Sequence, residues 1–184
     1  MARLAAFRKY SIIMTTLTHL DGQGRARMVN VGEKPITARR AIAAAQICMQ
    51  SQTLEQIRSN SLSKGDVLAV ARIAGIQAAK RCDELIPLCH SLPLDAVTVD
   101  FELDDALPGV RITASASVQS RTGVEMEALT AVSIAALTIY DMCKAVDKGM
   151  LIDKLCLVRK EGGRSGVWER PDAVDGHQET QSEE

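Results

Sequence analysis

Apolar residues occupy every second position along two stretches in the middle of the chain. Val97 to Leu103 form the first stretch and Val110 to Val118 the second, with polar residues at the positions between. Alternation with a period of two is typical of a strand that is buried on one face. Because the turn-forming segment 104–109 separates the two stretches, they predict an antiparallel hairpin whose apolar face needs a cover.

Two longer stretches have the spacing of helices that could supply this cover. Residues 65–81 place valines and alanines on one face, with Ser63 as the expected N-cap, and a shorter helical segment at 53–59 precedes them. Residues 125–147 contain neither Gly nor Pro and carry a continuous apolar stripe, which Gly149 is expected to end.

Two further strands complete the predicted fold. Residues 154–160 have the pattern of a last strand, whereas residues 37–49 are ambiguous because their alanines favour a helix. A strand at 37–49 would complete the order β-α-β-β-α-β, and we choose the strand. The prediction is an α+β, ferredoxin-like fold with an antiparallel sheet and its helices packed on one face. Such a topology by itself carries no function.

The length of 184 residues favours one domain with tails. The first 16 residues are basic and contain no acid, whereas the last 14 contain five acids and no Lys or Arg. We therefore expect a flexible tail at 1–16, a single domain at 17–169 and a disordered acidic tail at 170–184.

Composition narrows the class of function. A net charge of −1 and only 3% aromatic residues argue against a nucleic-acid partner, and no apolar run reaches the ~18 residues of a membrane span. Five cysteines without a C-x-x-C pair suit a reducing, cytoplasmic compartment. With only three histidines, a metal site of His and Cys is not expected.

Polar clusters mark where chemistry could occur. Lys64 stands just ahead of a predicted helix, where a cation suits an anion such as phosphate; the alternative is an ordinary capped helix with an exposed lysine. Cys89 and His90 lie in an apolar segment between Pro87 and Pro93. A histidine there is either functional or satisfied within the core.

The long predicted helix contributes the other clusters. Glu125 and Glu127 at its start are two residues apart and cannot share one helical face, although both could simply be first-turn acids. Asp141 and Lys144 near its end are three apart and do share a face. Such a pair could divide acid and base roles if it is partly desolvated; otherwise it is a surface ion pair.

Taken together, these clusters resemble a known family. The segments Lys64–Lys80, Leu85-Ile-Pro-Leu-Cys-His90, Thr122-Gly-Val-Glu-Met-Glu-Ala-Leu-Thr130 and Ala136–Val146, in this order and spacing, closely resemble the cyclic pyranopterin monophosphate synthase (MoaC) family of molybdenum cofactor biosynthesis. The ends are also similar, at Leu17–Leu20, Met28–Val31 and Lys160–Gly166, so that the resemblance spans roughly residues 17–169.

The resemblance implies a lyase with a ferredoxin-like fold. The family converts 3′,8-cyclo-7,8-dihydroguanosine 5′-triphosphate into cyclic pyranopterin monophosphate and releases pyrophosphate. An upstream radical S-adenosylmethionine enzyme supplies the substrate. Its subunits form a homohexamer, a trimer of dimers, with sites at the dimer interfaces. No cofactor is implied, and whether Mg²⁺ accompanies the triphosphate stays open.

Matched motif positions imply site residues. Asp141 and Lys144 correspond to the catalytic pair and Lys64 to a catalytic or phosphate-contacting lysine. The substrate-binding positions and their neighbours are Leu88, Cys89, His90, Met126, Glu127, Glu125 and Arg39. We expect Lys64 and Asp141 to serve one site from different subunits, because the ends of their helices are not obviously adjacent within one chain.

Two positions depart from the family pattern. Asn30 stands where an aspartate is expected, and Ser91 where a proline usually follows Cys-His. Neither change touches the proposed acid–base pair, but Asn30 removes any carboxylate role from its loop. The alternative function is a non-catalytic sensor of a small ligand, which would need binding groups but no Asp–Lys pair poised to titrate.

Overall fold

A computed structural model describes residues 23–171 of the chain. They belong to two compact units that divide after Asn30, and each is treated by itself. Of the first unit, residues 23–30 are described; of the second, residues 31–171. The predicted tail at 1–16 and almost all of the predicted tail at 170–184 lie outside the described residues, so both stay predictions.

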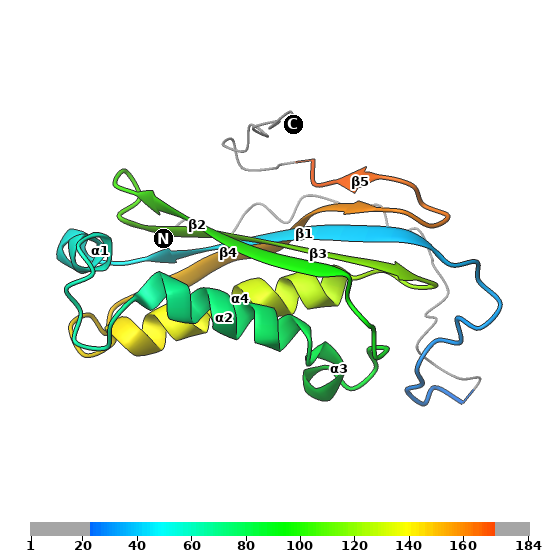
Figure 1. The fold of residues 1–184 in the computed structure, drawn as a ribbon. Coiled ribbons are helices and arrows are strands. Elements are labelled where there is room, and N and C mark those ends of the chain that lie inside the picture. The colour runs from blue at the N-terminus through cyan, green and yellow to red at the C-terminus, as the bar shows by residue number, and fades with distance from the viewer. Residues whose placement is uncertain (1–22, 172–184) are drawn as a thin grey trace, which may run out of the picture. The chain divides into compact units, whose positions relative to one another are not determined.

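The second unit contains an antiparallel sheet. Its strands follow the order β2-β3-β1-β4-β5, and every neighbouring pair is antiparallel (Figure 1). The strands are β1 (Thr37–Cys48), β2 (Ala96–Asp104), β3 (Gly109–Ser120), β4 (Leu151–Glu161) and β5 (Trp168–Glu169). The strand chosen at 37–49 is confirmed and lies in the middle of the sheet, whereas the two-residue β5 was not expected.

Helices cover one face of this sheet, as predicted (Figure 1). They are α1 (Ser51–Arg58), α2 (Val67–Ala79), the single turn α3 (Cys82–Leu85) and α4 (Glu125–Cys143). The α+β fold with an antiparallel sheet and packed helices is therefore confirmed.

Two helix ends differ from the prediction. Asp66, not Ser63, is the N-cap of α2, since its carboxylate accepts a hydrogen bond from the Ala69 N–H at 2.9 Å. The α4 helix ends at Cys143, four residues before the predicted end and well before Gly149. The carbonyl oxygen of Cys143 accepts from the N–H of Val146 at 2.9 Å and from that of Asp147 at 3.1 Å, and these bonds close the final turn.

The core between sheet and helices is aliphatic and rich in alanine. Gly75 allows α2 to approach α4 closely, because a Cβ there would lie 2.9 Å from the carbonyl oxygen of Ala131 and 3.1 Å from a methyl of Val99. Although α4 is long and apolar enough to cross a membrane, more than half of it is buried within the protein. It is the central core helix of this unit.

Candidate active site

Three charged side chains meet where α2 begins and α4 ends. The Lys144 ammonium lies 2.6 Å from one carboxylate oxygen of Asp141, and the Lys64 ammonium lies 3.0 Å from the other. Lys64 also donates to the main-chain carbonyl oxygen of Asp141 at 2.8 Å. We call these three residues the lysine–aspartate cluster.

Local structure explains why these residues meet. Lys64 lies in a tight turn that is anchored by the buried Leu62 and closed by a hydrogen bond from the N–H of Gly65 to the carbonyl of Leu62 at 3.0 Å. Gly65 has a left-handed φ of +84°, which glycine adopts without strain. The helices α2 and α4 run antiparallel, so the start of one meets the end of the other.

The electrostatics of the cluster favour an anionic ligand. The pKa of the Asp141 carboxyl lies below its usual range, first because Lys144 donates a hydrogen bond to it and then because Lys64 does. In return, the Asp141 carboxylate raises the pKa of the Lys144 ammonium. Two cations share one carboxylate, so a net positive charge remains. All three side chains are about half exposed, so these ion pairs add little stability.

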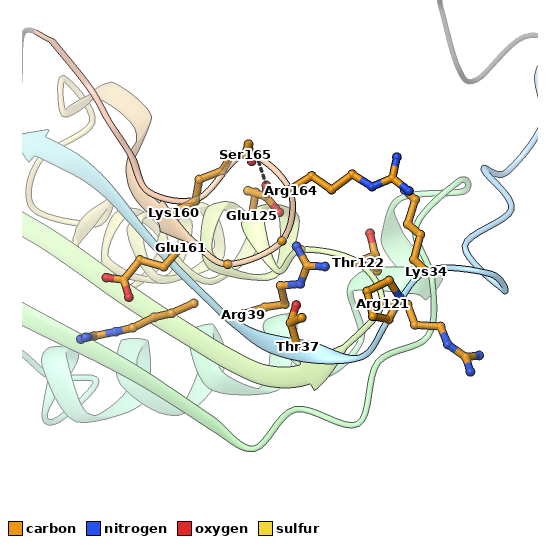
Figure 2. A pocket seen from close by; sticks show the side chains of 15 residues that line it. Lys34, Thr37, Arg39, Arg121, Thr122, Glu125, Lys160, Glu161, Arg164 and Ser165 are labelled. Atoms are coloured by element: carbon orange, nitrogen blue, oxygen red, sulfur yellow. Dashed lines mark hydrogen bonds and ion pairs between the residues drawn. The ribbon is translucent and has the colours of Figure 1, made fainter.

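A second group of charges lies at the opposite end of the sheet, where β1 begins and β3 and β4 end. There the structure has a pocket of about 560 Å³, which we call the cationic pocket (Figure 2). Six basic side chains and two acidic ones line it: Lys34, Arg39, Arg40, Arg121, Lys160 and Arg164, with Glu125 and Glu161. This excess of cations suits a polyanion.

Two of the lining side chains are held in place. Lys160 donates to a carboxylate oxygen of Glu125 at 2.8 Å. The Arg39 guanidinium lies against the glycine turn after β4, so closely that a Cβ on Gly163 would overlap it (Figure 2). Arg39 also donates to the carbonyl oxygen of Ser120 at 3.4 Å.

Glu127 turns away from the pocket into the protein, as the two-residue spacing from Glu125 predicts. Its side chain is buried, and chiefly this burial, supported by the charges of Glu125 and Asp83, raises the pKa of Glu127 to about 7. Burial also raises the pKa of the Cys89 thiol, and the nearby charge of Glu127 acts in the same direction. Glu127 can therefore keep its proton near neutral pH and donate a hydrogen bond.

The remaining predicted site residues are only partly exposed. Leu88, Cys89 and His90 are half-buried, and Met126 is exposed at 37%. The structure thus brings Arg39 together with Glu125 and Cys89 together with Glu127.

The structure separates these residues from the lysine–aspartate cluster. Glu127 and Asp141 lie in the first and last turns of the same helix, α4. At 1.5 Å per residue the two are about 21 Å apart along its axis. Lys64 and Asp141, in contrast, meet within one chain, which removes the basis for expecting them from different subunits.

Several lining residues had no predicted role. Lys160 and Arg164 belong to a segment that resembled the family, but nothing there assigned them a function, and Arg121 lies just before the Thr122 motif. Among residues 23–171, no group of three His, Cys, Asp or Glu side chains is arranged to hold a metal ion.

Comparisons with known proteins agree on one family. A model of the MoaC family matches residues 28–163. The chain is 62% identical over 155 residues to the cyclic pyranopterin monophosphate synthase of Chloroflexus aurantiacus, covering 84% of this chain and 95% of that protein. It is 57% identical over 164 residues to the protein of that name from Thermomicrobium roseum, covering 89% and 99%. The corresponding protein of Novosphingobium aromaticivorans is 61% identical, covering 84% and 98%.

Proposed function

Since this chain belongs to the MoaC family and is a cyclic pyranopterin monophosphate synthase of molybdenum cofactor biosynthesis, we propose that its reaction takes place at a site built from two copies of the chain. The substrate is 3′,8-cyclo-7,8-dihydroguanosine 5′-triphosphate, and the products are cyclic pyranopterin monophosphate and pyrophosphate. The lysine–aspartate cluster of one chain faces the cationic pocket end of another.

The observation that carries this proposal is the separation of the two groups along α4. A side chain that transfers a proton must come within about 3 Å of the reacting atom. Glu127 and Asp141, about 21 Å apart on one rigid helix, cannot both reach one reacting centre from the same chain. A second copy of the chain can supply the group from the opposite end of its own α4, because subunits of closed, symmetric oligomers present the same surfaces to one another.

The lysine–aspartate cluster supplies the proton transfers. A fused guanine–ribose framework must open and close again as a pyranopterin, which requires several protons to move. Lys144 stays charged beside Asp141 at 2.6 Å and can give a proton to one substrate atom, while the ionised Asp141 carboxylate can accept a proton from another. Lys64, bound to the same carboxylate, neutralises phosphate charge. His90, in the segment before β2, is proposed to contact the phosphates as well.

The cationic pocket holds the triphosphate and then the pyrophosphate. A triphosphate carries about four negative charges, which charge-assisted hydrogen bonds from Arg and Lys stabilise. To form the cyclic phosphate, a ribose hydroxyl loses its proton and its oxygen attacks the α-phosphorus, so that a new P–O bond forms and the bond to pyrophosphate breaks. This step depends on positioning and charge neutralisation, for which Arg39 and Lys160 are available in the pocket.

The proposed groups for binding the ring system are Glu127 and the residues near it. A protonated Glu127 can donate a hydrogen bond to the ring system. Leu88, Cys89 and Met126 offer apolar or weakly polar surface beside it.

The proposal includes a homohexamer, a trimer of dimers, in the cytoplasm. Val70 and Ile73 on α2 and Leu137 on α4 are apolar and about half exposed, which is consistent with burial against other copies. An upstream radical S-adenosylmethionine enzyme supplies the substrate.

Mixing two inactive variants tests the two-chain site. Lys144→Ala and Glu127→Ala change opposite ends of one helix, and Ala at position 127 removes the hydrogen-bond donor that Gln would keep. After subunit exchange, a mixed dimer has one site with both changes and one with neither, so pyrophosphate release should return to about a quarter of wild type. If native mass measurement confirms exchange and no activity returns, the two ends do not share a site.

A further inference from the structure

Asp147, three residues beyond Lys144, is a buried carboxylate to which the reaction assigns no role. Its side chain is only 2% exposed. One carboxylate oxygen accepts hydrogen bonds from the N–H of Gln50 at 2.8 Å and from the hydroxyl of Thr53 at 3.3 Å. The other accepts from the N–H of Gly149 at 3.0 Å and from the Gln50 side-chain amide at 3.5 Å.

These bonds make Asp147 the cap of α1. The N-cap residue of this helix, Gln50, makes no side-chain cap hydrogen bond of its own. The first N–H groups of a helix need an acceptor, and a negative charge at that end is favourable. Asp147 provides both from 97 residues away in the sequence. The Asp147 carboxylate is therefore held at the start of α1 by its hydrogen bonds to Gln50 and Thr53.

Asp147 also joins the two segments that carry the lysines of the cluster. Lys144 is the C-cap residue of α4, and the turn that contains it continues directly into Asp147. On the other side, α1 leads through residues 59–63 to Lys64. A second bond, from the Tyr140 hydroxyl to the carbonyl oxygen of Lys148 at 3.2 Å, closes the same turn.

We propose that Asp147 is a positioning residue for the lysine–aspartate cluster, an inference that rests on the proposed function of that cluster. The side chains of Lys64, Asp141 and Lys144 are about half exposed, so core packing does not hold their charged ends. Their relative placement depends on the backbone segments beneath them. Asp147 fixes one segment to the other through several hydrogen bonds, of which the one from Thr53 is buried.

Replacing Asp147 tests this role in the full-length protein. Asp147→Ala removes all four accepted bonds, and we expect a kcat about tenfold lower, because small displacements of reacting groups are costly. The KM should change much less than kcat, since the cationic pocket, which binds most of the phosphate charge, lies at the other end of α4 and is untouched. Asp147→Asn keeps one acceptor oxygen and should recover part of the kcat.

A matched control separates positioning from general stability. Asp104 is also a carboxylate that accepts two backbone N–H groups in a turn, those of Ala106 and Leu107, and it pairs with Arg111. It lies in the β2–β3 hairpin, outside both proposed groups of site residues. Asp104→Ala should lower the melting temperature as Asp147→Ala does, yet leave kcat near wild type.

Further variants keep the inference falsifiable if Asp147→Ala does not fold. Thr53→Val removes one bond from the α1 side at nearly constant volume, and it should lower kcat to a smaller degree. If Thr53→Val and Asp147→Asn both fold and keep the wild-type kcat, the positioning role is wrong. Lys144→Ala tests the proposed function itself, because normal turnover in that variant would overturn the role of the cluster. If Lys144→Ala loses turnover while Asp147→Asn and Thr53→Val stay fully active, only the positioning role of Asp147 is overturned.

Discussion

Lys64 and Asp141, 77 residues apart in the sequence, are joined twice within one chain. The Lys64 ammonium donates to the Asp141 carboxylate at 3.0 Å and to the main-chain carbonyl oxygen of the same residue at 2.8 Å. The second bond also satisfies a carbonyl in the last turn of α4. One side chain therefore serves both the end of a helix and the proposed site.

This contact predicts the outcome of a mixing experiment. If Lys64→Ala and Asp141→Ala are each inactive, their mixture should stay inactive after subunit exchange, because both residues serve a site from the same chain. Every site in the mixture then carries at least one change. Pyrophosphate release is the measurement, and native mass spectrometry confirms exchange. Recovered activity would show that the two residues reach one site from different chains.

Lys144→Ala should abolish turnover while leaving the protein folded. Loss of a proton-transferring group typically costs about 10²–10⁴ in rate, and the side chain is 53% exposed, so its removal leaves no cavity. Lys148→Ala, which removes an exposed lysine from the following turn, is the matched control and should keep the wild-type kcat. A near-normal kcat for Lys144→Ala would contradict the acid–base assignment.

Gly163→Ala should weaken substrate binding through Arg39. An added Cβ would overlap the Arg39 guanidinium, so we expect KM to rise about tenfold as a charge-assisted contact to phosphate is lost. Gly166→Ala is a close control, because this glycine has a similar left-handed φ, +63° against +73°, but open space around it. Both changes strain the backbone. An equal rise in KM for both would show that Arg39 is not the cause.

Glu127→Gln should change how stability depends on pH. The native pKa of Glu127 is about 7 against an ordinary value of 4.5, so between these values the native state binds more protons than the unfolded chain. The protonated Glu127 then adds to the free energy of unfolding in full below about pH 4.5, and this addition is lost as pH rises through 7. The loss is about 3 kcal/mol at most. Relative to wild type, the Gln variant should gain stability from pH 5 to pH 8 in urea unfolding. Glu102→Gln, at an exposed carboxyl, should show no such gain, and equal curves for both variants would contradict the assignment.

Local patterns predicted most of the elements. Period-two alternation located both strands of the β2–β3 hairpin to within two residues of their ends, because each strand has one buried face. Helical geometry also predicted that Glu125 and Glu127 diverge: one carboxylate binds Lys160 and the other is buried.

Features that depend on distant partners escaped prediction. The α4 helix ends at Cys143. The turn that follows contains Asp147, which accepts a hydrogen bond from Gln50, almost 100 residues away in the sequence. The pairing of Lys160 with Glu125 links a strand to a helix start, and no local pattern signals it. The cationic pocket gathers residues from β1, from the loop between β3 and α4, from the start of α4 and from the end of β4, so its charge appears only once the sheet is assembled.

The central place of β1 has a consequence for folding during synthesis. This strand is made before the others, yet it lies between β3 and β4, and its partner residues 151–161 emerge from the ribosome more than 100 residues later. Until then one edge of β1 has no strand beside it. Contacts this far apart in sequence form slowly, and exposed strand edges are prone to pair with other chains. Until residues 151–161 are made, the nascent chain therefore exposes a strand edge that can pair with other chains.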